Sequence, residues 1–298
     1  MNGAQAARPP AGRLERFLKT PKGYITAILV SLTLIGALRP QDHIGLLNAA
    51  AAVVTALVLD GAVMFLQRRR IRYSDGGVIT ALIVADIMGH ATPLPILAAT
   101  TGVALLSKHI LRVGRKPVFN PAAVGLLFAI LVFTNTGQSW WGSLALMPVW
   151  LVLAVIGGGL LITARVNKFP QVTAFLGAYF FLLLAMAVLH IGLPSDTPGA
   201  ALRPPFVNTA LYLAFFMLTD PPTSPAAYRQ QILFGLIAAA VGTAIFATSG
   251  GLAYLLVGLL TANLWKTVWQ LATKGRATSS ADASADNSSE GRSPRVVV

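Results

Sequence analysis

The chain has 298 residues, of which 55% are hydrophobic and 11% are charged, and it contains no cysteine. An average soluble domain carries roughly 25% charged residues, and a single core of this size cannot bury so much apolar surface. The composition excludes disordered, fibrous and disulfide-rich proteins, and it leaves no thiolate for a metal, an iron–sulfur cluster or a c-type haem. An all-α polytopic membrane protein is the class that remains.

The formal net charge of +13 is interpreted as a topology signal. Lys and Arg cluster beside apolar segments, as the positive-inside rule describes, so we predict a lipid bilayer and no nucleic acid as partner. Residues 1–20 form a basic arm that we place in the cytoplasm. The apolar run that follows lacks a small-residue cleavage pattern, so we expect it to remain as a membrane span rather than act as a signal peptide.

Ten apolar segments follow one another along the chain, and we predict a membrane helix at each. They cover residues 24–38, 44–66, 77–89, 94–111, 119–134, 144–164, 171–192, 206–218, 231–247 and 251–272. The third and eighth are short and run into proline-bearing stretches. A bilayer tolerates such broken segments only where protein covers their free backbone groups, so we expect both inside the bundle.

The connections between these segments alternate between basic ones and ones poor in Lys and Arg. The latter contain only Arg39 and Arg203 as basic residues of this kind. This alternation predicts ten crossings of the membrane, with both termini in the cytoplasm. We expect this membrane to be the bacterial inner membrane. Residues 274–298 are rich in Ser, Ala and Asp, and we predict a disordered cytoplasmic tail there.

The chain also resembles itself. Shifted by 129 residues, the third segment matches the eighth, and Val124–Ala129 matches Val257–Ala262 at a shift of 133. Because a shift of five spans reverses direction in the membrane, we predict two inverted five-helix repeats, residues 21–134 and 135–273. In folds of this kind, paired broken helices frame a central site.

The polar residues nearest to the membrane lie at the ends of the broken segments and at the start of the fifth. Our candidates for a binding site are Asn120, Thr80, Asp75, Asp220, Thr223 and Ser224. One interpretation makes all of them helix caps and turn residues, since short polar side chains satisfy free backbone groups there. The other makes them a site in which helix ends bind a polar ligand.

Several strings resemble one family. Ser74–Gly76, Thr80–Leu82, Lys108–Gly125 with its Phe-Asn-Pro-Ala core, and Phe215–Pro225 with its Thr-Asp-Pro-Pro-Thr-Ser-Pro string are similar to the NqrB/RnfD family. These are membrane subunits of the sodium-pumping NADH:quinone reductase and of the Rnf electron transport complex. The resemblance covers about residues 21–273. It implies a urea-transporter-like inverted-repeat fold and a flavin, riboflavin or FMN, the latter usually joined to a threonine by a phosphoester.

The chain departs from the family at that threonine. The loop after the fifth segment is short and lacks the family's Ser-Gly-Ala-Thr-like motif. Its only threonines are Thr134 and Thr136. We therefore expect a non-covalent flavin. Trp140 and Trp141 in the same loop can stack on a flavin ring or serve as interfacial belt residues, and we favour the belt.

Two acidic residues lie within predicted spans, where a charge is costly and suggests an ion pathway. Asp86 is a candidate for a cation or proton role, and Asp60 is close enough to the basic end of its helix to pair with an Arg there. The four histidines do not lie deep in facing helices, so we expect no haem and no metal. Gly157–Gly159 is interpreted as close helix packing rather than a nucleotide loop.

From these features we predict a membrane subunit of a flavin-dependent electron transport complex. The flavin performs the redox chemistry, quinone is a candidate acceptor, and cation translocation is a trait carried over from the family. The chain contains no recognisable NADH or ferredoxin site, so other subunits must deliver or remove the electrons. The alternative is a small-solute or flavin transporter or channel on the same fold, since fold does not determine function.

Overall fold

A computed structural model describes residues 13–37, 43–68, 75–89, 92–133, 148–194, 197–204 and 206–290. Its first half begins with a short helix, α1 (Arg13–Leu18), within the predicted basic arm. Five apolar helices follow, each close to a segment predicted from the sequence. They are α2 (Pro21–Ala37), α3 (His43–Leu66), α4 (Asp75–Ile87), α5 (Leu94–Ile110) and α6 (Pro121–Val132). A small hairpin between α5 and α6 pairs β1 (Arg112–Val113) with β2 (Lys116–Pro117) in antiparallel register.

The second half also consists of helices. Its helices are α8 (Val149–Val166), α9 (Phe169–Val188), the short η2 (Ala200–Leu202), α10 (Phe206–Tyr212), η3 (Leu213–Met217), α11 (Tyr228–Ser249) and α12 (Tyr254–Glu290). The predicted eighth segment is thus an α-helix that changes to a π-helix at η3. A π-helical turn alters which backbone groups pair, and such turns are frequent at functional sites.

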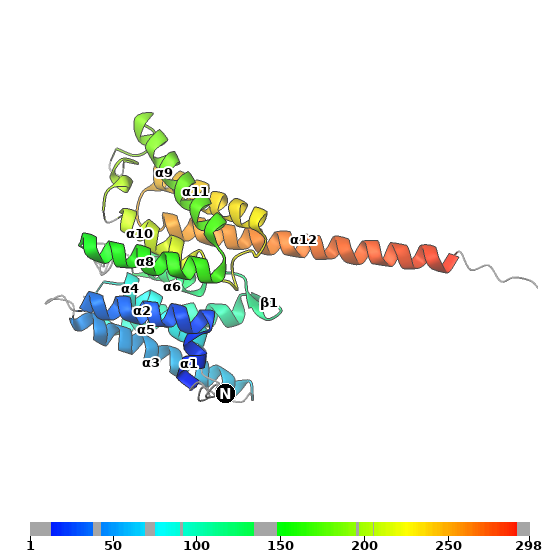
Figure 1. Cartoon of the computed structure of the whole chain (residues 1–298), viewed down its shortest axis with the longest axis horizontal. Coiled ribbons are helices and arrows are strands. Elements are labelled where there is room, and N and C mark those ends of the chain that lie inside the picture. The colour runs from blue at the N-terminus through cyan, green and yellow to red at the C-terminus, as the bar shows by residue number, and fades with distance from the viewer. Residues whose placement is uncertain are drawn as a thin grey trace, which may run out of the picture.

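The two halves lie side by side in one bundle. In Figure 1 the helices from α2 to α5 form the lower part, and α8 to α11 form the upper part. The contacts between the halves run through α2 with α8 and through α6 with α12. As predicted from their length and their prolines, α4 and η3 lie inside. Every residue from Ala81 to Gly89 and from Leu213 to Thr219 is buried. The broken helices therefore avoid lipid.

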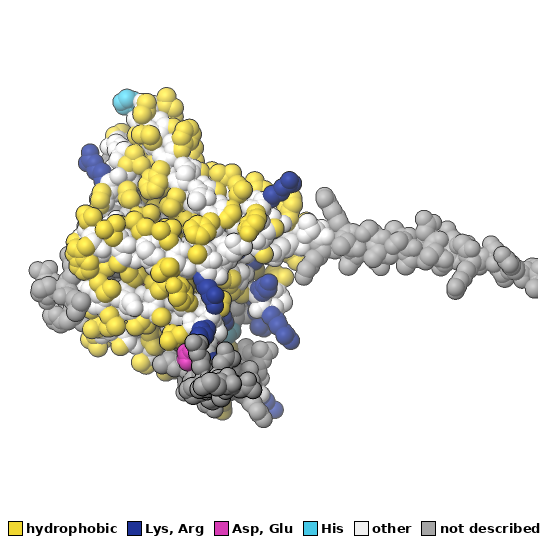
Figure 2. Space-filling view, in the orientation of Figure 1, with side chains coloured by type: hydrophobic (Ala, Val, Ile, Leu, Met, Phe, Trp, Pro, Cys, Tyr) yellow, Lys and Arg dark blue, Asp and Glu magenta, His cyan; other side chains and the backbone are white. Residues whose placement is uncertain are grey.

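The outer surface is suited to lipid. Val58, Phe65 and Leu66 are 62%, 75% and 79% exposed, although they are large and apolar. Figure 2 shows hydrophobic side chains covering the helices on this face, with most Lys and Arg toward the end at which α12 leaves the bundle. Among the described residues, four helices are long and apolar enough to cross a membrane by themselves: Gly45–Leu66 within α3, α8, α9 and α11. The shorter apolar helices complete a polytopic all-α membrane fold.

Matched glycines pack the last two helices of each half. A Cβ on Gly125 would lie 2.6 Å from the Thr100 carbonyl oxygen of α5, and one on Gly258 would lie 2.3 Å from the Ala238 carbonyl oxygen of α11. Only glycine allows helices to approach so closely. These two glycines occupy equivalent places in the shift of 133 residues. The inverted relation between the halves, and the repeat boundaries at residues 134 and 135, remain predictions.

The disordered tail predicted for residues 274–298 remains a prediction. The α12 helix continues to Glu290 and projects away from the bundle (Figure 1). Its first turns are apolar and pack against α11. Helix propagation adds one hydrogen bond for each residue fixed, so a helix already nucleated in the bundle can extend outward.

Candidate functional site

The start of α6 is tied to both halves by Asn120. Its side-chain Oδ1 accepts a hydrogen bond from the Ala123 N–H at 3.1 Å, so Asn120 is the N-cap predicted from the sequence. Its Nδ2 donates to the Met217 carbonyl at the end of η3, at 3.0 Å. Its backbone N–H donates to Oδ1 of Asn263 on α12, at 2.8 Å. Asn120 is 3% exposed, so these contacts are shielded from solvent.

The turn between η3 and α11, residues 218–227, is held by donors from elsewhere in the chain. Because it is neither helix nor strand, its carbonyl groups need partners from other segments. Asn263 donates to the Thr223 carbonyl at 3.1 Å, and Lys266 donates to the Pro222 carbonyl at 2.9 Å. Lys168 donates to the Pro225 carbonyl and Gln171 to the Leu218 carbonyl. These donors fix the turn, of which Leu218, Thr219 and residues 223–225 are buried.

Asp220, Thr223 and Ser224 stabilise this turn from within. The Thr223 hydroxyl donates to the Asp220 carboxyl at 2.7 Å, and the Ser224 hydroxyl donates to the Asp220 carbonyl at 2.8 Å. Burial raises the pKa of Asp220, although the Thr223 hydroxyl and the nearby Lys266 and Lys168 act in the opposite direction. Burial also lowers the pKa of Lys168 to about 8, against the attraction of Asp220. The positive charges of Lys168 and Lys266, outside the turn, thus partly offset the negative charge of Asp220 within it.

Beside this turn lies a pocket of about 850 Å³ between the two halves. This volume falls within the usual range for cofactor sites. Its apolar lining consists of Ile25, Ile79, Ile83, Ile162, Val166 and Phe216, among others. Its polar lining includes Thr80, Asn120, Thr219 and Asp220. Five basic residues also line it: Lys22, Lys108, Arg112, Arg115 and Lys116. An apolar interior beside several cations favours a ligand that is largely apolar and carries negative charge or acceptor atoms.

The structure brings three of the six predicted binding residues to this pocket, namely Asn120, Thr80 and Asp220. Thr223 and Ser224 are buried in the turn and do not line the pocket. Asp75 lies exposed in the first turn of α4, where a negative charge interacts favourably with the helix dipole. The cap-and-turn interpretation thus describes Asp75, Thr223 and Ser224, and Asn120 combines a cap with a place at the pocket.

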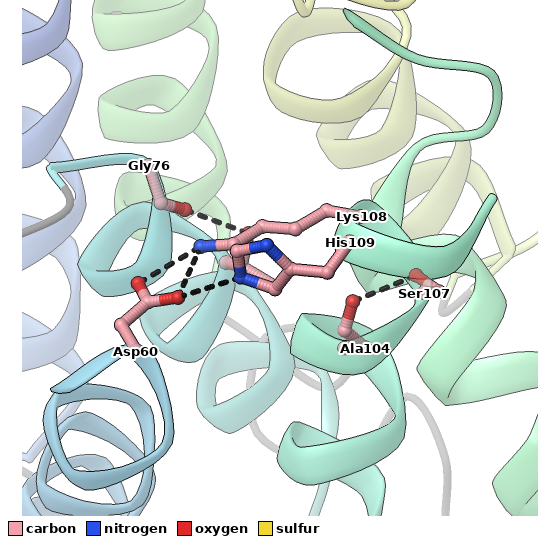
Figure 3. A network of polar contacts seen from close by, with 7 residues as sticks. Asp60, Gly76, Ala104, Ser107, Lys108 and His109 are labelled. Carbon is pink, nitrogen blue, oxygen red and sulfur yellow. Dashed lines mark hydrogen bonds and ion pairs between the residues drawn. The ribbon is translucent and has the colours of Figure 1, made fainter. Parts of the chain in front are cut away.

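Asp60 pairs with a different partner from the one expected. Figure 3 shows its carboxyl, on α3, facing Lys108 and His109 at the end of α5. The Lys108 amine lies 2.8 Å from the carboxyl, and His109 Nε2 lies 3.2 Å from Oδ1. The expected Arg pairing is therefore wrong for Arg68, the described Arg at that helix end, because α5 brings the partly buried Lys108 to the Asp60 carboxyl. This neutralised pair borders the pocket through Lys108 and His109.

Asp86, the second candidate for an ion pathway, lies apart from the pocket. Its carboxyl contacts the Thr33 hydroxyl at 2.7 Å and the Tyr212 hydroxyl at 3.1 Å. The carboxyl thus joins α2 and α4 of the first half to α10 of the second.

Other predicted features have simpler outcomes. Within the described part of the chain no group of three or more His, Asp or Glu could hold a metal ion. A Cβ on Gly159 would lie 2.2 Å from the Phe215 ring and one on Gly158 2.8 Å from Ile28, as close packing predicts, whereas Gly157 faces open space. Thr134, Thr136, Trp140 and Trp141 lie outside the described residues, so the predictions about them remain predictions.

Sequence reasoning missed four donors to the turn: Lys168, Gln171, Asn263 and Lys266. They are polar residues in or beside apolar helices, and each is 5% exposed or less. Polar side chains inside membrane helices are expensive unless they are paired. That rarity was a signal available in the sequence, but it did not identify their partners.

Comparison with known proteins agrees with the motifs. No family model matches the chain. The RnfD protein of Pseudomonas paraeruginosa (strain DSM 24068 / PA7), a subunit of an ion-translocating oxidoreductase complex, is 26% identical to it, over 64% of this chain and 72% of that protein. The protein of the same name from Sodalis glossinidius (strain morsitans) is also 26% identical, over 64% of this chain and 75% of its own length. Together with the shared motifs and the polytopic helical fold, these similarities make the chain a relative of the RnfD/NqrB family.

Proposed function

We propose that this protein is a membrane subunit of an ion-translocating oxidoreductase complex and that it holds a non-covalent flavin in the pocket between its two halves. The observation that carries the proposal is the pocket itself, with its apolar lining, its placed polar groups and its basic residues. Similarity to the two RnfD proteins supports the same assignment. The flavin, when bound, supplies the electron transfer, and the protein supplies position and polarity.

The side chains at the pocket fit an isoalloxazine ring. Ile79, Ile83 and Phe216 offer apolar and aromatic surface to a planar ring. The Thr80 hydroxyl donates its hydrogen to the Gly76 carbonyl at 2.8 Å, and the Thr219 hydroxyl donates to the Phe215 carbonyl at 2.6 Å. Each hydroxyl oxygen therefore retains lone pairs, and these can accept from a ring N–H.

The basic residues distinguish two forms of the ligand. Arg112, Arg115 and Lys116 belong to the hairpin between α5 and α6 and line the pocket. A phosphate placed there would gain charge-assisted hydrogen bonds, which FMN can form and riboflavin cannot. Arg115→Ala should therefore weaken FMN more than riboflavin if FMN is the ligand. An equal effect on both would favour riboflavin.

Asn120 is a poor residue for testing the site, because its amide already holds α6 to η3. Thr80→Val is cleaner. Thr100→Val is a matched control, since Thr100 makes the same 2.8 Å bond to its own helix backbone but does not line the pocket. Losing one hydrogen bond costs about 0.5–1.5 kcal/mol, or roughly two- to tenfold in Kd.

The test is titration of the purified full-length protein with riboflavin and FMN, followed by flavin fluorescence. We expect binding by the wild type, weaker binding by Thr80→Val and unchanged binding by Thr100→Val. The absence of flavin binding by the wild type would overturn the proposal, as would solute flux in proteoliposomes that lack any redox donor.

Other subunits would deliver electrons, with quinone as the proposed acceptor and cation translocation coupled to the transfer.

A further inference from the structure

A carboxyl group is buried where the short helices of the two halves meet. Asp86 lies in the last turn of α4 and is 4% exposed. Its neighbours along the chain, from Ala81 to Gly89, are all buried. None of Asp86, Thr33 and Tyr212 lines the pocket described above. Whatever Asp86 does is therefore separate from ligand binding in that pocket.

The hydroxyl partners of Asp86 come from two different elements. Thr33 of α2 lies 2.7 Å from Oδ1, and Tyr212 of α10 lies 3.1 Å from Oδ2. Tyr212 is itself 2% exposed. Both oxygen pairs are at direct hydrogen-bonding distance. The bonds between them must be made with hydrogens.

Counting those hydrogens favours a protonated carboxyl. The Thr33 hydroxyl also lies 2.9 Å from the Leu29 carbonyl oxygen, which can only accept. Tyr212 supplies its hydrogen to Oδ2. Thr33 has one hydrogen for two contacts, to Leu29 and to Oδ1. If Asp86 carries a proton on Oδ1, it donates to Thr33, Thr33 donates to Leu29, and all three contacts are satisfied. An ionised carboxylate leaves one contact without a hydrogen.

The charges around Asp86 lead to the same conclusion. The elements packed on α4 are α2, α3, α5 and α6. The charged or titratable side chains of the first three include Lys22, Asp60, Lys108 and His109, and these gather at the pocket end. Gly77 lies against the Asp60–Lys108 pair, and Asp86 is nine residues further, about 14 Å along the helix.

The remaining described elements near Asp86 add no counter-charge to it. Within Pro121–Val132, α6 has no charged residue, and neither does η3. Arg165 of α8 donates to the Lys19 carbonyl, at the Lys22 end of α2. In the described part of the chain, Asp86 forms no ion pair. An ionised carboxylate buried without a counter-charge is far more costly than a neutral acid that is hydrogen-bonded.

We propose that Asp86 is a proton-binding site in the membrane part of the protein, with Thr33 and Tyr212 as its hydrogen-bonding partners. The bound proton completes a chain of hydrogen bonds from Tyr212 through Asp86 and Thr33 to Leu29. This chain links α10 of the second half to α4 and α2 of the first. The proton completes the link between α4 and α2, while the Tyr212 bond to Oδ2 joins α10 to α4 in either protonation state.

Infrared spectroscopy of the full-length protein in lipid vesicles tests the proposal. A protonated carboxyl has a C=O stretching band that shifts on exchange into deuterated water. At neutral pH the wild type should show such a band that is lost in Asp86→Asn. Asp75→Asn is the control, because Asp75 is an exposed acid on the same helix and its removal should leave the band in place.

Tyr212→Phe and Thr33→Val provide a second measurement that does not require the Asp86 variant to fold. Each removes one hydrogen bond to the carboxyl, and each should shift the band in frequency. Identical spectra for the wild type and Asp86→Asn would overturn the proposal. So would a band unchanged in both hydroxyl variants, or one that disappears when sodium replaces potassium, since that would indicate a metal-cation site.

Discussion

Asn120 joins the two halves, and the structure predicts the cost of removing it. Asn120→Ala removes the cap bond to the Ala123 N–H and the bond to the Met217 carbonyl, while the bond from the backbone N–H to Asn263 remains. Loss of an N-cap costs typically about 1 kcal/mol. Loss of a second buried hydrogen bond costs about another 1 kcal/mol. We therefore expect the free energy of unfolding to fall by about 2 kcal/mol.

Asn120→Ser separates these two terms. Serine is a good N-cap but is too short to reach the Met217 carbonyl, so it should restore about 1 kcal/mol. The assay is reversible unfolding of the purified protein in mixed micelles of increasing denaturing detergent. Ser31→Ala, an exposed change, is the control and should stay within about 0.5 kcal/mol of the wild type. A loss in Asn120→Ala no larger than that control, or a loss in Asn120→Ser equal to that in Asn120→Ala, would refute the reasoning.

Three further predictions use the same unfolding assay. Burial lowers the pKa of Lys168 from 10.5 to about 8, so the unfolded chain binds this proton more tightly; stability should rise between pH 8 and 10, and Lys168→Met should flatten that rise. Gly125→Leu should disrupt folding because its Cβ would meet the backbone of α5, whereas Gly61→Leu faces open space and should be tolerated; equal effects would contradict the packing. Asp60→Asn should cost roughly 3 kcal/mol because it removes the negative charge that faces the Lys108 amine, and removing Lys108 as well should recover part of the loss; strictly additive losses would contradict the pairing.

Local sequence signals predicted the helices well. The ten apolar segments correspond to helices whose ends mostly differ by a few residues, and the prolines after the third and eighth segments correctly placed α4 and η3 inside. Asn120 was correctly predicted as the cap of α6. These features depend on composition, periodicity and neighbouring residues, which the sequence displays directly.

Long-range partners could not be predicted in the same way. Asp60 and Lys108 are 48 residues apart, and Asn120 and Asn263 are 143 residues apart, so their pairing depends on how whole helices pack. The π-helix at Leu213–Met217 was likewise not predicted from the sequence. The pocket lies between helices of both halves, and only Thr80, Asn120 and Asp220 of the six candidate residues line it. Which candidates do so depends on how the helices pack.

The measurement that tests the central claim most directly is the absorption spectrum of the purified full-length protein after incubation with flavin and removal of the excess. The account predicts a flavin spectrum that bleaches on reduction and returns on reoxidation. It also predicts that all of the flavin is released into solution when the protein is denatured. A colourless protein that retains neither riboflavin nor FMN would contradict the claim that this pocket serves a flavin-dependent electron transport subunit.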